Sequence, residues 1–189
     1  MKVIVGISGA SGVIYGIRLL QALRDSEGVE THLVLSATGK LNIRLETEFK
    51  VSDVEALARH VHDDRNLAAS ISSGSFRCDA MVVAPCSMKS LSGIVNSYSD
   101  TLLTRAADVT LKDRRPLILV PRETPLHLGH CKLLYEAAQL GAIIAPPMPA
   151  FYNKPESVQD IVDHTVGRLL DLLGLESGLV RRWGGAGQD

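Results

Sequence analysis

The sequence lacks the paired cysteines of a disulfide framework or a zinc knuckle. Its three cysteines, Cys78, Cys86 and Cys131, are odd in number and include no C-x-x-C spacing. This pattern excludes a disulfide-rich secreted domain and a zinc-ribbon protein, because both need cysteines in pairs. We therefore expect a cytoplasmic protein.

An excess of charge of one sign is also missing. The chain has 20 Lys and Arg residues against 21 Asp and Glu residues, a net charge of -1. A nucleic-acid-binding protein normally carries a basic excess, so we expect no nucleic-acid partner. The uncharged residues 3–17 are interrupted by glycines, and the uncharged residues 137–153 contain prolines, so we expect no membrane span either.

Aromatic residues are scarce, at 4% of the chain, so the core must be mostly aliphatic. Apolar runs of the length of buried strands occupy residues 2–7, 31–35, 80–84, 117–120 and 142–145. Apolar residues at helical spacing lie between or after them, in residues 15–24, 101–111, 126–139 and 155–173. Alternating strands and helices predict an α/β fold with a parallel sheet covered on both faces. We expect a single domain over residues 1–175 and a polar, glycine-rich tail over residues 176–189.

In open α/β sheets, ligands bind beyond the carboxyl ends of the strands. The predicted strands are followed by the Ser-Gly-Ala-Ser-Gly segment 8–12, Ser36, the segment 85–90, Arg122 with Glu123, and Phe151 with Tyr152, and four of these five positions offer hydroxyls, helix N-terminal amides or a cation. Hydroxyls, amides at helix N-termini and a cation together suit a phosphate or a flavin. The glycines at 6, 9 and 12 do not match the dinucleotide fingerprint, and tight packing of strand against helix is the alternative explanation for them.

Three further features have alternative interpretations. His127 and His130 form an H-x-x-H pair without an evident third ligand, so we expect no metal site. The Asp63-Asp64 pair lacks the D-D-x-x-D pattern of metal-dependent prenyl synthases and is interpreted as a solvated turn. Cys86 could be a nucleophile, but its position in an apolar run favours a buried structural thiol.

Several motifs, taken in order, resemble those of the UbiX-type flavin prenyltransferases, a family long described as aromatic or phenylacrylic acid decarboxylases. The resemblance runs from about residue 2 to residue 183. It is carried by the segments 9–12, 15–16, 45–47, 85–91, 105–108, 112–116, 120–123, 147–152 and 168–170, together with Trp183.

The resemblance implies a Rossmann-like, flavodoxin-like three-layer fold and a metal-independent transferase. The reaction would join the dimethylallyl group of dimethylallyl phosphate to N5 and C6 of reduced FMN. The prenylated FMN would then serve a UbiD-type decarboxylase, and the enzyme would be a homo-oligomer, a dodecamer by family analogy. The alternative is an FMN-binding subunit of an aromatic acid decarboxylase that does not itself transfer a prenyl group. An FMN-dependent cysteine decarboxylase would need a catalytic histidine early in the fold, which is not evident.

The resemblance also implies roles for individual residues. FMN contacts would fall on Gly9, Ala10, Ser11, Ser36, Ser87, Met88, Lys89, Ser90 and Arg122. Contacts to the prenyl phosphate would fall on Tyr152, Arg168, Lys112 and Arg105. In catalysis, Ser11 would orient the flavin, Glu123 would transfer a proton and Lys112 would stabilise the departing phosphate. The Trp183 face would stabilise positive charge by roughly 1–2 kcal/mol. Arg168 lies far along its predicted helix from Tyr152, so the two could come from different subunits.

Overall fold

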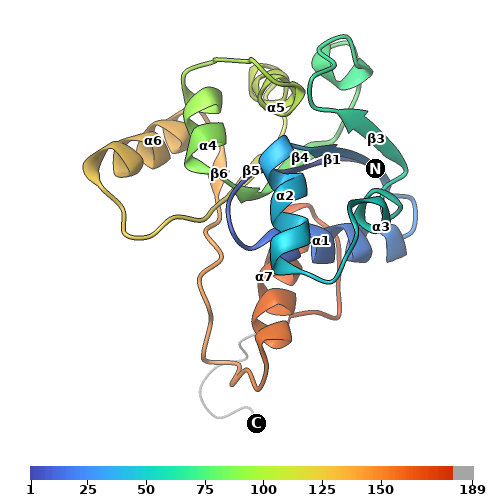
Figure 1. Ribbon diagram of the computed structural model, residues 1–189, viewed down its shortest axis with the longest axis vertical. Coiled ribbons are helices and arrows are strands. Elements are labelled where there is room, and N and C mark those ends of the chain that lie inside the picture. Colours follow the sequence, from blue (N-terminus) through green and yellow to red (C-terminus); the bar gives the residue numbers. More distant parts are fainter. Residues whose placement is uncertain (181–189) are drawn as a thin grey trace.

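The computed structural model, which describes residues 1–180, contains a sheet of six parallel strands in the order β3-β2-β1-β4-β5-β6 (Figure 1). This is the Rossmann strand order. The strands are added toward one edge of the sheet from β1 to β3 and toward the other edge from β4 to β6, so the topological switch point lies between β1 and β4. The three-layer α/β fold is therefore confirmed. The strands are β1 Lys2–Ile7, β2 Glu30–Leu35, β3 His60–Asp63, β4 Ala80–Cys86, β5 Leu117–Pro121 and β6 Ile143–Ile144.

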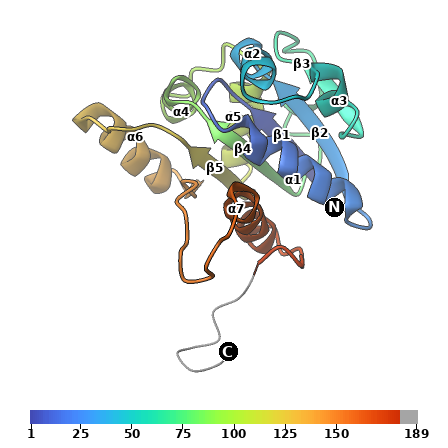
Figure 2. The ribbon, with the colours of Figure 1, turned by 60° about the horizontal axis from the view of Figure 1, so that its bottom comes forward.

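Helices cover both faces of the sheet (Figures 1 and 2). They are α1 Val13–Asp25, α2 Ala37–Glu46, α3 Val51–Glu55, the 3-10 turn η1 Ser70–Ser72, α4 Met88–Val95, α5 Leu102–Lys112, α6 Leu128–Gln139 and α7 Val158–Leu172. None of these helices within residues 1–180 is long and apolar enough to cross a membrane.

Successive residues of the central strands point into two separate aliphatic cores. Val3, Val5 and Ile7 of β1 pack with α1, α2, α3 and α7, whereas Ile4 packs with η1, α4, α5 and α6 on the other face. This alternation follows from the two-residue period of a strand. Among the described residues, no Phe, Tyr or Trp side chain is fully buried in either core, as the scarcity of aromatic residues led us to expect.

The strand β3 was not predicted, because its sequence His-Val-His-Asp is polar. It lies at the edge of the sheet, pairs with β2 and is largely exposed, so it needs no apolar run. The interpretation of Asp63 and Asp64 as a solvated turn holds for Asp63, which is exposed and opens a turn by accepting a hydrogen bond from the Asn66 amide at 2.9 Å, but not for Asp64, which is half-buried. Asp63 ends β3, while the Asp64 carboxylate accepts a hydrogen bond from the Leu103 amide at the start of α5, at 2.9 Å. Burial raises the pKa of Asp64.

Helix ends follow their capping residues. The Thr101 and Ser157 hydroxyls accept hydrogen bonds from backbone amides at the starts of α5 and α7. α7 therefore begins at Val158, three residues after Pro155, which we expected inside the helix. The helix α2 was not predicted, because only Gly39 and Ile43 of its ten residues are buried.

Two glycines allow helices to approach the sheet closely. A Cβ atom at Gly16 of α1 would overlap the carbonyl oxygen of Ala84 in β4. A Cβ atom at Gly39 of α2 would lie 2.5 Å from the carbonyl oxygen of Ile7. Backbone atoms cannot rotate away as side chains can, so these positions fix how close α1 and α2 lie to the ends of β1 and β4.

We predict that Gly16→Ala lowers the free energy of unfolding by about 1–3 kcal/mol, because the added methyl group overpacks the contact between α1 and β4. Urea unfolding of the variant measures this change. Gly178→Ala is the control, since a Cβ atom there meets open space. Equal stability of the two variants would contradict the close approach at Gly16.

Candidate functional site

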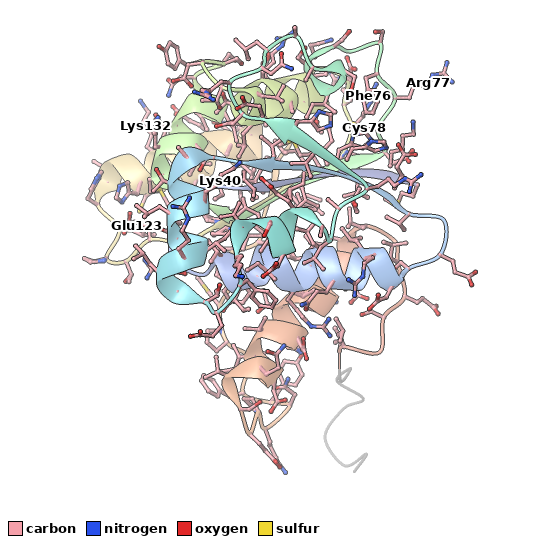
Figure 3. All side chains as sticks on the ribbon, turned by 45° about the vertical axis from the view of Figure 1, so that its right-hand side comes forward. Lys40, Phe76, Arg77, Cys78, Glu123 and Lys132 are labelled. Carbon is pink, nitrogen blue, oxygen red and sulfur yellow. The ribbon has the colours of Figure 1, made fainter. Side chains whose placement is uncertain are left out.

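A cavity of about 1080 Å³ opens at the carboxyl ends of β1, β2 and β4. It lies beside the switch point between β1 and β4, which is where ligands bind in this fold. Its walls include many of the predicted cofactor residues, namely Gly9, Ser36, Ser87, Met88, Lys89 and Ser90, and also Glu123. Figure 3 shows Glu123 beside α2, on the side of the molecule away from Phe76 and Cys78.

The buried hydroxyl of Ser8 joins the two turns that form the floor of this cavity. It donates a hydrogen bond to the Pro85 carbonyl oxygen at 2.9 Å and accepts one from the Ser87 amide at 2.8 Å. The turn after β1 is thereby held against the turn after β4. Ser8 was not assigned a role from the sequence, because its partners lie almost 80 residues away.

Gly9 lies where the turn after β1 meets α2. A Cβ atom at this position would lie 2.5 Å from the Cβ atom of Thr38. Tight packing, the alternative explanation for this glycine, therefore applies here. The same lack of a side chain leaves the backbone of residue 9 exposed to the cavity, so the two explanations hold together.

Two helix N-termini point their amides toward the cavity. Ser36 caps α2 by accepting a hydrogen bond from the Gly39 amide at 3.0 Å. Ser87 caps α4 by accepting one from the Ser90 amide at 3.2 Å, and it also donates to the Ser90 hydroxyl at 3.1 Å. Paired N-terminal dipoles and hydroxyls favour an anion such as a phosphate.

The N-terminus of α1 already has an anionic partner within the chain. The Glu46 carboxylate accepts hydrogen bonds from the amides of Gly12 and Val13, at 2.8 and 3.4 Å. One turn earlier on α2, the Asn42 amide group donates to the Ala10 carbonyl oxygen at 3.0 Å. These two side chains position the segment that contains Ser11. The sequence signal is their spacing of four residues, which places both on one face of α2.

Arg122 and Glu123 follow β5 in an exposed loop. Glu123 lines the cavity and its carboxylate accepts a hydrogen bond from the Thr124 amide at 3.1 Å. Arg122 reaches the same edge, where its amide donates to the Cys86 carbonyl oxygen at 3.3 Å. The side chain of Cys86 is fully buried, which raises the pKa of its thiol to about 12. The interpretation of Cys86 as a buried structural thiol is confirmed.

Three predicted substrate-binding cations lie away from the cavity within one chain. Lys112 ends α5, roughly 16 Å along the helix from its cavity-lining first turn, and its ammonium group contacts Asp113 at 2.9 Å. The Arg105 guanidinium is paired with Asp108 at 2.7 Å. Arg168 is exposed in the chain and is paired with Asp171 at 2.7 Å.

Tyr152 lies in the segment between β6 and α7. Its hydroxyl is 3.3 Å from Nε2 of the buried His164, and the Asn153 side chain lies 3.2 Å from Nδ1 of the same ring. His164 was missed from the sequence, where it reads as one polar residue on an apolar helix face. The predicted contribution of Trp183 falls outside the described residues 1–180.

Comparison with known proteins matches the Flavoprotein family over residues 1–170. The chain is 58% identical over 187 residues to the flavin prenyltransferase UbiX of Escherichia coli K12, covering 98% of this chain and 99% of that one. The chain belongs to the UbiX-type flavoproteins. The family expectation drawn from the sequence motifs is thus confirmed.

Solved structures of UbiX-type flavoproteins have the same fold. A dodecameric FMN-dependent UbiX-like decarboxylase from Escherichia coli O157:H7 has a TM-score of 0.96 and 54% identity, covering 98% of this chain and all of that one. AnUbiX (PadA1), in complex with FMN and dimethylallyl pyrophosphate, has a TM-score of 0.95 and 48% identity, covering 97% of each chain.

We predict that Ser87→Ala weakens FMN binding as well as folding, because it removes a cap at the cavity wall. Loss of the cap should lower the free energy of unfolding by about 1 kcal/mol. Ser157→Ala is the matched control, since Ser157 caps α7 and does not line the cavity. Fluorescence titration with FMN should show weaker binding for Ser87→Ala alone, and equal affinities in both variants would contradict the assignment of Ser87 to the site.

Proposed function

We propose that this protein is a flavin prenyltransferase that moves a dimethylallyl group from dimethylallyl phosphate to N5 and C6 of reduced FMN. The observation that carries the proposal is the cavity at the switch point of the sheet, in a chain 58% identical to a flavin prenyltransferase. The cavity's walls combine anion-binding helix ends with the carboxylates of Glu123, Asp64 and Asp100.

The residues of the cavity fit FMN. The N-termini of α2 and α4 supply amides and the hydroxyls of Ser36, Ser87 and Ser90 for a phosphate group, and Gly9 allows a close approach of the ligand. The volume of about 1080 Å³ slightly exceeds the range typical of ligand pockets, which leaves room for a second, small substrate. Reduced FMN supplies the electron-rich ring that accepts the prenyl group.

Glu123 is the proton-transfer group in this proposal. Its carboxylate lines the cavity and lies in an exposed loop, where it can approach a bound ligand. Closing the fourth ring at C6 releases a proton, and the departing phosphate takes one up. Ser11, held in place through Glu46 and Asn42, orients the flavin edge beside it.

Breaking the allylic C–O bond places negative charge on the departing phosphate. Lys112, Arg105 and Arg168 are the cations that we assign to stabilising that charge, with Tyr152 as a hydrogen-bond donor. Because Lys112 lies at the far end of α5 from the cavity of its own chain, we propose that neighbouring subunits supply such residues. α6 projects from the body of the chain and exposes Leu128 and Tyr135, as expected of an oligomer surface (Figure 2).

The alternative function is an FMN-binding subunit of an aromatic acid decarboxylase, favoured by the name of the dodecameric UbiX-like protein. We favour the transferase, whose prenylated product would then pass to a UbiD-type decarboxylase. We place the protein in the cytoplasm, since Cys78, Cys86 and Cys131 are all free thiols.

The two functions are separated by anaerobic incubation of the protein with FMN, dithionite and dimethylallyl phosphate, with dimethylallyl pyrophosphate in a parallel reaction. A flavin prenyltransferase should give a prenyl adduct in the mass spectrum of the extracted flavin, and an unmodified flavin would overturn this function.

We predict that Glu123→Gln retains FMN affinity but slows prenylation by roughly 10²–10⁴-fold, because it removes the proton-transfer group. Unchanged turnover would remove Glu123 from the mechanism.

Sharing of sites between subunits is tested by co-expressing Lys112→Met and Glu123→Gln chains, each of which we expect to be strongly slowed when expressed alone. If the two residues serve one site from different chains, random mixing should restore about a quarter of the wild-type rate. The control is co-expression of two differently tagged Lys112→Met chains, which should stay inactive. No recovery in the mixed oligomer would place both residues in a site made by one chain.

A further inference from the structure

Three of the six histidines gather at the edge of the sheet, away from the flavin cavity. His32 of β2 and His60 of β3 are direct partners in the parallel register, and Glu30 lies two residues before His32 on the same face of β2. One oxygen of Glu30 is 3.1 Å from Nε2 of His32 and also 3.1 Å from Nε2 of His60. We call Glu30, His32 and His60 the edge cluster.

Burial and ring contacts hold His32, the innermost residue of the edge cluster, in place. The His32 ring is buried, stacks on His60 with ring centroids 4.5 Å apart, and meets the edge of Phe76 at 5.0 Å. The other ring nitrogen of His32, Nδ1, lies 2.9 Å from Nε2 of His62. Burial lowers the pKa of His32 and of His62.

Two of the three distances in the edge cluster are close to those between the ligands of a tetrahedral metal ion. Zinc binds imidazole nitrogen and carboxylate oxygen at about 2.0–2.1 Å, which places neighbouring ligand atoms about 3.3 Å apart. All three ligand atoms of the edge cluster lie within 4.8 Å of one another. Metal-bound histidines donate their other ring N–H to an acceptor that orients the ring, and Nε2 of His62, 2.9 Å from Nδ1 of His32, can be that acceptor.

We infer that the edge cluster binds one first-row transition-metal ion of the Zn²⁺ type, through Nε2 of His32, Nε2 of His60 and a Glu30 oxygen, with water as the fourth ligand. Such an ion joins the edge strand β3 to β2, and it is stabilising because it binds the folded chain alone. The site differs from the proposed active site: Glu30 and His60 begin their strands, whereas the flavin cavity lies at the carboxyl ends.

Binding changes the positions of protons without requiring a redox step. In the metal-free chain, both Nε2 atoms face the same Glu30 oxygen and donate hydrogen bonds to it. A neutral imidazole can move its proton from Nε2 to Nδ1, which frees the Nε2 lone pair for the metal. The Nδ1–H of His32 then donates to Nε2 of His62, whose own proton moves from Nε2 to its Nδ1. The Lys2 ammonium, 3.7 Å from the same Glu30 oxygen, competes with the ion for this carboxylate.

The test is isothermal titration calorimetry of the full-length, FMN-loaded, chelator-treated protein with Zn²⁺ in a phosphate-free buffer. We expect one ion per chain in the wild type. His60→Gln should weaken that binding at least tenfold, since loss of a supporting residue alone can cost this much. Lys2→Gln should tighten it by removing the competing ammonium group. If His60→Gln fails to fold, Glu30→Gln takes its place with the same expected loss.

The matched controls lie on α6, where His130 and Cys131 form the other arrangement that could attract zinc. His130→Gln and Cys131→Ser should leave the Zn²⁺ affinity unchanged. FMN affinity and prenylation should be unchanged in His60→Gln, because the edge cluster is remote from the cavity. The proposal is overturned if the wild type binds no Zn²⁺, if His60→Gln binds it as the wild type does, or if binding is lost in His130→Gln or Cys131→Ser.

Discussion

The pairing of β1 with β4 is the constraint on which the candidate site depends. The chain crosses the sheet between these strands, so two strand-to-helix turns leave the sheet side by side and in opposite directions. The buried Ser8 hydroxyl fixes their separation by bonding to Pro85 and Ser87 at once. Gly16 then lets α1 lie against the end of β4. The N-terminus of α4 consequently has a fixed position relative to the turn after β1.

Much of the fold could be predicted from the sequence because β1, β4 and β5 are buried on both faces and therefore consist almost entirely of apolar residues. The edge strand β3 could not, because an exposed strand has no such requirement. The helix α2 buries too few residues for its apolar positions to show a helical periodicity in the sequence. Local signals thus locate the buried elements, and the peripheral ones are specified by tertiary contacts.

The residues of the candidate site also fall into those that local sequence signals reveal and those that only the folded chain reveals. Gly9, Ser36 and Ser87 could be found from the sequence, because each follows a predicted strand. Glu46 and His164 could not, because each acts on a segment that only the folded chain brings close. The predicted cations were found as residue types, but one chain does not assemble them at the cavity. The few aromatic residues contribute little to the described cores, which are aliphatic. Tyr98, Tyr135 and Phe151 lie on the surface.

The burial of Cys86 has a consequence for an enzyme that handles an allylic electrophile. Soft thiolates capture such carbon centres readily, and Cys86 lies one residue before the cavity-lining Ser87. Its side chain is fully enclosed and its thiol stays protonated far above physiological pH, so it offers no thiolate. The floor of the cavity is thereby protected from self-alkylation, and the flavin meets no competing nucleophile from this position.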